Sequence, residues 1–339
     1  MVSLGLFHAF KKRYPEIAYM KPVGQQYRLI DGNRIDKDAV LISKTYNLSD
    51  PLPDMSPIAV PRGFTSSFIA ETQNATTLYD RLLESNTRLA KNKSFILYEG
   101  TGHAGVGSVF DMSNATVAKL LTSKVILVTI GGVGSSIDEV MMNKATFDQQ
   151  GIEVLGVIVN KVHEEKYDKI SKLVTSGLNR LGLPVFGVIP MVSMLSWPSV
   201  LELIEDLDGE LLGGDNRLLN SVQRFVIGDM QPHDALNAFS ENTLLIVPGN
   251  REGLILAALE SSDLSGIIFT NQKKPDQTVI DRIKTKGIPM FVVNGDSFSI
   301  ASRINSLIFK VRVNESHKIA KAQELVETYV NIDQICELL

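Results

Sequence analysis

The stretch FILYEGTGHAGVGSVFDMSN, residues 95–114, combines an apolar run, an acid and a glycine-rich turn. The apolar run is typical of a buried strand, Glu99 follows it directly, and Ser113 is placed to begin a helix. A strand, a glycine loop and a helix start are the parts of a phosphate-binding site. The stretch therefore predicts an α/β fold, and it raises the question whether this loop is where phosphate binds.

The glycine loop does not match a mononucleotide-binding P-loop. That motif is Gly-x-x-x-x-Gly-Lys-Ser/Thr, and no lysine follows Glu99 until Lys119. GTGHAG in the same loop has the form of a dinucleotide-binding fingerprint, but the helix begins too late for its last glycine. Glu99 itself has two possible roles at the strand end. It either binds magnesium or caps the glycine turn.

The runs around this stretch repeat one pattern. Apolar segments rich in β-branched residues alternate with helical stretches, and their apolarity is continuous rather than alternating. Continuous apolarity favours parallel strands that are covered on both faces, and ligands in such folds bind beyond the carboxyl ends of the strands. The predicted strands of this first part are 17–20, 94–99, 124–130, 153–160 and 184–190.

Two further charged residues stand at positions where this fold binds ligands. Lys21 follows the predicted strand 17–20 beside a glycine turn, and Asp38 lies at the start of a predicted helix over 36–46. Each alone could be a surface charge. Together with Glu99 they place one cation and two carboxylates at one edge of the sheet, where a nucleotide phosphate and its metal ion would lie.

Length and composition limit the classes of protein that fit. A chain of 339 residues predicts two domains, and a net charge of −4 does not favour nucleic acid or an anionic membrane as a partner. The single cysteine, Cys336, suits a reducing compartment. No apolar run reaches the roughly 18 residues of a membrane span, and no signal peptide is recognisable. We expect a globular cytoplasmic protein.

Several motifs occur in an order that resembles a known family. They are KPVGQ from Lys21, DKDAV from Asp36, EGTGH from Glu99, VIVNKV from Val157 and GLPVFGVIP from Gly182. By these motifs the chain is similar to the dethiobiotin synthetase-like branch of P-loop NTPases over roughly residues 1–205. This branch includes cobyrinic acid diamide synthases and the N-terminal part of long bacterial phosphate acetyltransferases. The resemblance implies ATP and Mg²⁺ as cofactors and a small-molecule acceptor, and we also expect a homodimer.

The resemblance also implies roles for individual residues. Lys21 would approach the acceptor and the transferred phosphate, and Asp38 and Glu99 would bind magnesium. His103 is a candidate proton shuttle, or a loop residue that contacts a partner or the acceptor. Asn160 would face the adenine ring, and the remaining candidates for binding the nucleotide or acceptor are Lys161, Pro190, Met191, Gly100 and Gly132.

One element of the family pattern does not appear in the sequence. In the family, a strand and the P-loop precede the first helix, and LGLFHAFKKRYP from Leu4 resembles that helix. Either the start of the chain is assigned too late, or the protein has lost this segment. We expect weak ATP binding without the charge-assisted hydrogen bonds of the loop, and unpaired edges on the strands beside the missing one.

The second half resembles a DRTGG domain. We place the domains at 1–208 and 216–328, with a C-terminal tail over 329–339. In the motif, Asn250–Arg251 stands for Asp-Arg, and Thr270-Asn271-Gln272 stands for Thr-Gly-Gly. Asn250, Arg251 and Thr270 are candidates for binding an anion at a helix start, and ordinary loop chemistry is the alternative. The sequence DSFS further predicts that Ser297 caps the next helix.

Three functions follow from these patterns. The first is an ATP- and Mg²⁺-dependent enzyme that activates a carboxylate or similar acceptor and carries a regulatory, ligand-sensing domain. The second is a non-catalytic nucleotide-sensing or interaction protein. The third is a regulatory protein like the N-terminal part of phosphate acetyltransferases. Acetyl transfer itself is disfavoured, because that catalytic domain would follow the DRTGG-like region.

Overall fold

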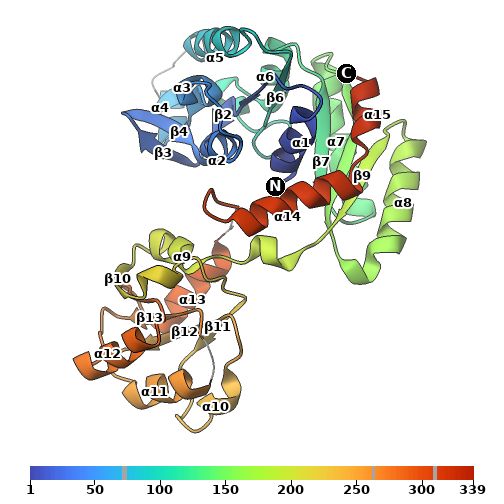
Figure 1. Cartoon of the computed structure of the whole chain (residues 1–339). Coiled ribbons are helices and arrows are strands. Elements are labelled where there is room, and N and C mark those ends of the chain that lie inside the picture. Colours follow the sequence, from blue (N-terminus) through green and yellow to red (C-terminus); the bar gives the residue numbers. More distant parts are fainter. Residues whose placement is uncertain (71–74, 262–263, 308–310) are drawn as a thin grey trace. The chain divides into compact units, whose positions relative to one another are not determined.

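The structure, a computed structural model, describes residues 1–70, 75–261, 264–307 and 311–339. The chain forms two compact units. Unit 1 comprises residues 1–192 and 316–339, and unit 2 comprises residues 193–315. Both combine helices with parallel strands (Figure 1), so the predicted α/β class is confirmed.

The parallel strands of unit 1 form two separate hydrogen-bonded groups. In the first group, β1 (Ile17–Met20) pairs in parallel with β6 (Phe95–Tyr98). In the second, β7 (Val125–Ile130), β8 (Val154–Val162) and β9 (Val185–Pro190) pair in that order. No pairing joins β6 to β7 in the part of the chain that the structure describes. The predicted parallel sheet is therefore found as two groups, with the unpaired edges that were expected beside the strand that does not appear in the sequence.

β6 and β7 are more exposed than β1 and β8, the strands with which they pair. All four residues of β1 are buried, whereas all four of β6 are only half-buried. On β7, Val128 is 49% and Ile130 is 63% exposed. The prediction that each of these apolar runs is covered on both faces is thus wrong for β6 and β7. A strand without a neighbour on one side leaves that edge and its side chains open to solvent.

Shorter strands and eight α-helices complete the described part of unit 1 that precedes residue 193. β2 (Val23–Gly24) pairs with β5 (Ile58–Ala59), and β3 (Tyr27–Ile30) forms a hairpin with β4 (Asn33–Asp36). The predicted helix over 64–92 is found as two helices, α4 and α5, and residues 71–74 between them lie outside the described residues. The helices are α1 (Val2–Lys11), α2 (Lys37–Tyr46), α3 (Leu52–Met55), α4 (Phe64–Ala70), α5 (Thr76–Leu89), α6 (Asn114–Leu120), α7 (Gly134–Gln149) and α8 (Tyr167–Arg180).

The C-terminal segment belongs to unit 1, which differs from the predicted boundary after residue 328. Its helices are α14 (Ser316–Tyr329) and α15 (Ile332–Glu337). α14 packs along α1, where Glu327 pairs with Lys12, and Val330 bridges to Gly187 of β9. This one segment therefore contacts both the first helix and the three-stranded group of unit 1.

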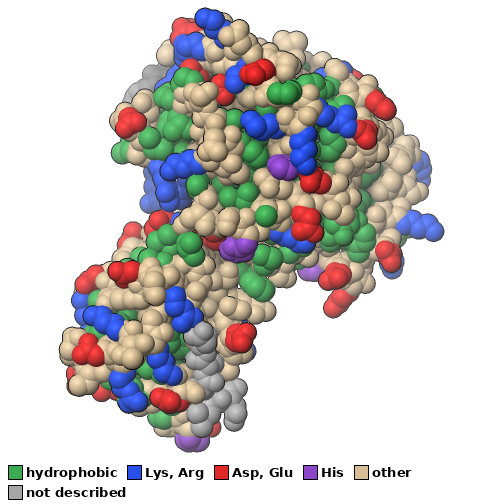
Figure 2. All heavy atoms as spheres, viewed as in Figure 1, with side chains coloured by type: hydrophobic (Ala, Val, Ile, Leu, Met, Phe, Trp, Pro, Cys, Tyr) green, Lys and Arg blue, Asp and Glu red, His purple; other side chains and the backbone are tan. Residues whose placement is uncertain are grey.

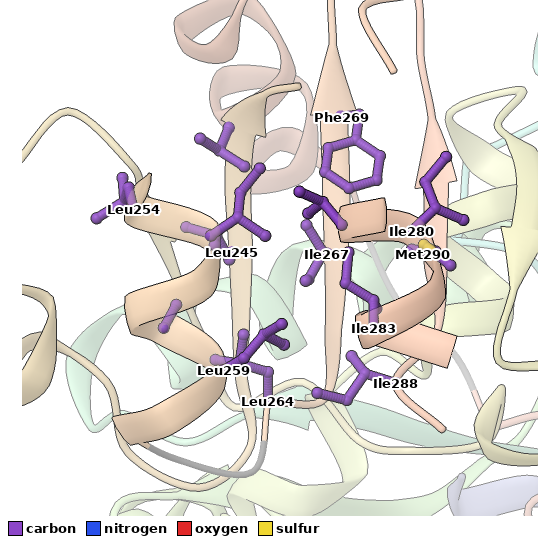
Figure 3. Packing of buried hydrophobic residues seen from close by; sticks show 14 of the residues in the cluster. Leu245, Leu254, Leu259, Leu264, Ile267, Phe269, Ile280, Ile283, Ile288 and Met290 are labelled. Carbon is purple, nitrogen blue, oxygen red and sulfur yellow. The ribbon is translucent and has the colours of Figure 1, made fainter. Parts of the chain in front are cut away.

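Unit 2 is built on a five-stranded sheet with the order β10-β14-β13-β12-β11. Apolar side chains from these strands and from α11 and α12 interlock in one of its two cores, and Leu245, Ile267 and Ile283 lie at its centre (Figure 3). The strands are β10 (Glu210–Gly213), β11 (Arg224–Ile227), β12 (Thr243–Pro248), β13 (Gly266–Thr270) and β14 (Met290–Val292). The helices are α9 (Val200–Asp206), α10 (Ala235–Ala238), α11 (Glu252–Ser261), α12 (Gln277–Thr285) and α13 (Ser297–Ser306).

The surface agrees with the charge balance of the sequence. Basic and acidic side chains are interspersed over the visible face (Figure 2). Among the described residues, no helix combines the length and the apolar composition that crossing a bilayer requires.

Candidate functional site

Lys21 lies at the centre of a compact group of charges in unit 1. Its residue is 4% exposed. The ammonium nitrogen Nζ lies 3.0 Å from Asp38 Oδ2 and 3.0 Å from Glu99 Oε1. It also donates a hydrogen bond of 3.2 Å to the carbonyl oxygen of Gly100. The three residues predicted from separate strand and helix ends are thus brought together, and we refer to them as the lysine cluster.

The fold explains why these three side chains meet. In the parallel pair β1–β6, Met20 lies opposite Tyr98, so the residues that follow both strands emerge side by side. The backbone agrees, because Glu99 N donates to Met20 O over 2.9 Å and Lys21 N donates to Met55 O over 2.8 Å. The cluster therefore stands at the carboxyl end of parallel strands, where α/β proteins bind ligands.

Two residues that the sequence did not single out hold the carboxylates in place. The Tyr19 hydroxyl donates to Glu99 Oε2 over 2.8 Å. Asp36 caps α2, since its Oδ1 accepts the Asp38 backbone N–H over 2.9 Å. An acid just before a helix is a recognisable capping signal, so Asp36 could have been predicted. Nothing in the strand sequence IAYM distinguishes the role of Tyr19.

The surroundings of Lys21 and of the neighbouring Tyr19 fix the protonation of these two side chains. Burial alone would lower the pKa of Lys21, but the carboxylates of Glu99 and Asp38 outweigh it and raise that pKa above its ordinary value. The pKa of Tyr19 is also raised, first by burial and then by the neighbouring Glu99 carboxylate. Lys21 is therefore a cation and Tyr19 a neutral hydrogen-bond donor throughout the physiological pH range.

The donor set suits magnesium together with a phosphate ligand. Within the described residues, no three His, Cys, Asp or Glu side chains are grouped to hold a metal ion by themselves. Magnesium in nucleotide sites usually takes one or two carboxylates and fills its other positions with water and phosphate oxygens. Asp38 and Glu99 supply two carboxylates against one ammonium, a net charge of −1 that favours a dication.

The glycine loop that follows β6 folds around Asn114. The Asn114 side chain donates to the carbonyl oxygens of Thr101 and His103 over 2.9 and 2.7 Å. A Cβ on Gly100 would lie 2.8 Å from Asn114 Oδ1, so a larger residue there would push the Asn114 side chain out of its present position. Ser113 caps α6 through the Thr116 N–H, which confirms the predicted helix start. The loop is thus held by the side chain of Asn114, the first residue of α6. His103 is exposed at its surface, where its Nδ1 accepts the Gly105 N–H.

The other candidates in unit 1 lie around the three-stranded group. Asn160 is in β8, and its side-chain oxygen accepts the Lys161 N–H over 2.9 Å. Pro190 ends β9, and Met191 N donates to Val162 O. Among the described residues, no hydrogen bond or ion pair links any of them to the lysine cluster. Gly132 follows β7, where a Cβ would lie 2.8 Å from Ser136 Oγ.

The candidates in unit 2 are engaged within that unit. Asn250 is exposed, and Arg251 donates from Nη2 to the carbonyl oxygen of Met230. Thr270 is fully buried at the end of β13, with its hydroxyl 3.1 Å from that of Ser297. No contact among the described residues joins these three into one site.

The loop after β13 has the left-handed backbone conformation that glycine usually adopts. Asn271 and Gln272, which stand for the two glycines of the motif, have φ values of 57° and 55°. This left-handed region favours glycine and tolerates asparagine.

The prediction that Ser297 caps α13 is wrong. Asp296 is the cap, since its Oδ1 accepts the Ser299 N–H over 2.9 Å.

Comparisons with known proteins identify the families that the two parts of the chain match. Residues 1–199 match the AAA domain family and residues 202–307 match the DRTGG domain family. A phosphate acetyltransferase from Synechocystis sp. is 24% identical over 352 residues, which cover 100% of this chain and 50% of that protein. A phosphate acetyltransferase from Nitratidesulfovibrio vulgaris is 25% identical over 349 residues, covering 98% of this chain and 49% of that protein.

The chain spans about half the length of these curated relatives. A crystal structure of the CBS and DRTGG domains of the regulatory region of Clostridium perfringens pyrophosphatase covers 45% of this chain and 77% of that chain. Its TM-score is 0.29 and its identity 16%, which is too distant to support a conclusion. The chain belongs to the AAA domain family, as a P-loop NTPase-like domain followed by a DRTGG domain, the arrangement of the N-terminal part of long phosphate acetyltransferases.

Proposed function

We propose that unit 1 binds ATP with magnesium at the lysine cluster and that unit 2 is a regulatory domain. The observation that carries this proposal is the buried Lys21 ammonium, held 3.0 Å from each of two carboxylates at the carboxyl end of parallel strands. A structural ion pair would need one carboxylate. The second gives the cluster the excess negative charge that a magnesium ion would balance.

Each residue of the cluster has a definite task in this proposal. Asp38 and Glu99 would hold the metal ion, and Lys21 would turn its ammonium towards a phosphate oxygen. Tyr19 would keep the Glu99 carboxylate in place through its hydrogen bond. Bound magnesium supplies charge neutralisation for the phosphates. The reaction class implied by the family resemblance is activation of a carboxylate or similar acceptor by phosphoryl transfer, which depends mainly on positioning.

Calorimetric titration of the whole chain with ATP and magnesium tests the proposal. We expect weak but measurable binding that requires magnesium and falls at least tenfold in Lys21→Met. The matched control is Lys93→Met, because Lys93 is half-buried and paired with one carboxylate, that of Asp50. Equal affinity of wild type and Lys21→Met, or an equal loss in the Lys93 variant, would contradict the proposal.

A second candidate is nucleotide sensing without turnover. It is favoured by the match of the chain to half of proteins named phosphate acetyltransferases and by the DRTGG domain that accompanies it. In this case the nucleotide would bind and alter the DRTGG domain, and no phosphate would be released. A measurement of ADP formation over hours, at ATP concentrations that saturate binding, separates this candidate from the enzyme.

A further inference from the structure

We propose that the turn after β1, residues 22–26, determines which metal ion the lysine cluster accepts and makes the cluster prefer Mg²⁺ to the larger Ca²⁺. The positioning residues for this preference are Asp36 and Thr101, which hold the turn from two sides. The inference rests on the proposed function and adds metal specificity to it. The turn begins directly after Lys21 and contains β2.

The turn is tied to the start of α2 through the backbone of Gln26. Gln26 N donates to Asp36 Oδ2 over 3.3 Å, and Lys37 N donates to Gln26 O over 2.8 Å. Asp36 is 2% exposed, and its other oxygen, Oδ1, accepts the Asp38 N–H. One buried carboxylate therefore connects the turn after Lys21 with the backbone of Asp38.

Gly24 allows the turn to approach Asp36 this closely. A Cβ at Gly24 would lie 2.4 Å from Asp36 Oδ2 and 2.6 Å from Asp36 Cβ. A side chain at this position would therefore displace the carboxylate from its place. The glycine of the KPVGQ motif thus has a physical role, because it leaves room for Asp36 beside the turn.

The turn is tied to the glycine loop by Thr101. The Thr101 hydroxyl donates to Val23 O over 2.7 Å. Thr101 lies two residues after Glu99, and its backbone is itself held by the side chain of Asn114. Its N–H donates to Asn114 Oδ1 over 3.2 Å, and its carbonyl oxygen accepts from Asn114 Nδ2 over 2.9 Å. The segment that follows Glu99 is thus fixed to the same turn as the start of α2.

Asp38 and Glu99 would therefore offer a metal ion two carboxylates of limited freedom. Both lie 3.0 Å from the Lys21 ammonium. Mg²⁺ requires contacts of about 2.0–2.1 Å in a near-ideal octahedron, whereas Ca²⁺ takes oxygens at about 2.3–2.6 Å in flexible geometry. Residues that orient metal ligands usually change metal affinity by about 10–100-fold. Because the smaller ion tolerates less movement of its ligands, loosening the turn should weaken Mg²⁺ binding more than Ca²⁺ binding.

Calorimetric titration of the whole chain with ATP, once in saturating magnesium and once in saturating calcium, measures this preference. We expect the wild-type chain to bind ATP about tenfold more tightly with magnesium. Thr101→Val removes the hydroxyl that holds the turn and leaves the charge unchanged, and it should lower the ratio of the two affinities about threefold or more. Thr87→Val is the matched control, because the Thr87 hydroxyl also donates to a backbone carbonyl oxygen of unit 1, that of Leu83, over 2.8 Å.

Asp36→Asn separates positioning from charge. Asparagine caps a helix as well as aspartate does, but its amide group would meet the Gln26 N–H, donor against donor. The loss of a nearby charge alone would weaken binding with both dications alike, whereas the loss of positioning lowers their ratio. The control is Asp296→Asn, which changes the corresponding cap of α13 in unit 2. A ratio that is unchanged in Thr101→Val or in Asp36→Asn, or lowered equally in the controls, would overturn the inference.

A second measurement distinguishes failure of this inference from failure of the proposed function. The NMR signal of the Lys21 ammonium reports its ion pairs without nucleotide or metal, and it should move in Thr101→Val but not in Thr87→Val. ATP binding with an unchanged ratio would overturn the inference and leave the nucleotide site standing. Failure of the wild-type chain to bind ATP with either metal would overturn the proposed function and the metal preference together. A Lys21 signal that does not move in Thr101→Val would overturn the positioning role itself, and urea denaturation confirms that each variant is folded.

Discussion

At the scale of single residues, Lys21 is the side chain on which the candidate site depends most. Its ammonium pairs with two carboxylates whose side chains are 15% and 23% exposed. Removing one partner of a fully buried ion pair costs about 3–5 kcal/mol, because a charge is left buried without compensation. The partial exposure of Asp38 and Glu99 reduces this cost.

We therefore expect Lys21→Met to lower the free energy of unfolding by about 2 kcal/mol. Urea denaturation in the absence of metal measures this value. Because the remaining carboxylates repel each other, magnesium should restore part of the loss in this variant. A variant as stable as the wild-type chain would show that the lysine cluster is solvated more than its geometry indicates.

Alkaline pH offers a second test at the residue scale. Burial raises the pKa of Tyr46 to about 12 and that of Tyr98 to about 12, and the pKa of Lys21 is raised as well. A group whose pKa is higher in the folded state stabilises the fold below its unfolded pKa, and this contribution is lost as pH rises through the folded pKa. The stabilising contribution of these groups therefore does not change with pH below pH 10, the ordinary tyrosine pKa. It is lost progressively as the pH rises from 10 to 12.

Urea unfolding at a series of pH values should show this alkaline decline, and the decline should be steeper in the wild-type chain than in Tyr98→Phe. The phenylalanine variant removes one of the shifted groups. The same decline in both proteins would contradict the role of Tyr98.

Sequence reasoning found the charges of the site and missed their supports. Strand ends and helix starts are easily recognised in an apolar pattern, and this is why Lys21, Asp38 and Glu99 were predicted. In the structure, Asp38 and Glu99 each lie 3.0 Å from the Lys21 ammonium. Tyr19 was missed because a tyrosine in a buried strand has the same pattern as any core residue. The role of Asn160, implied by the resemblance, and that of His103, suggested by its place in the glycine loop, stay predictions.

At the scale of elements, the local pattern identified the strands but not their neighbours. The apolar runs over β6 and β7 are as continuous as the run over β8, yet β6 is only half-buried and β7 exposes Ile130. A run of apolar residues indicates a strand, whereas burial depends on whether another strand pairs with each edge. The unpaired edges were expected only from the family pattern.

This difference predicts unequal effects of the same substitution on two strands. Ile130 on β7 is 63% exposed, and Ile158 on β8 is fully buried. Ile130→Ala should change stability by no more than about 0.5 kcal/mol, whereas Ile158→Ala should cost about 2–5 kcal/mol. Thermal denaturation of the two variants checks the contrast. Equal costs would mean that the edge of β7 is covered in solution.

At the scale of the whole molecule, the C-terminal segment shows how a chain can leave a domain and return to it. Residues 316–339 were predicted to divide between the second domain and a tail, but they pack on unit 1. Sequence alone could not place them, because the partners of α14 on α1 lie more than 300 residues away. One such contact joins Lys12 to Glu327, with |i−j| of 315.

Gly5 on α1 tests this packing. A Cβ at Gly5 would lie 2.3 Å from Val326 Cγ2 and 2.8 Å from the Ala322 carbonyl oxygen, both on α14. Overpacking of this kind usually costs about 1–3 kcal/mol, so Gly5→Ala should lower the thermal midpoint. As a control, Gly134→Ala on α7 meets nothing within 4 Å. A Gly5→Ala variant at least as stable as this control would contradict the docking of α14 on α1.

The central claim is that Asp38 and Glu99, with Lys21 between them, form a metal and phosphate site. Manganese can replace magnesium, and electron paramagnetic resonance distinguishes bound from free manganese in the presence of ATP. The account predicts that the wild-type chain binds manganese together with ATP and that Asp38→Asn with Glu99→Gln abolishes this binding. Manganese binding that is unchanged in the double variant would contradict it.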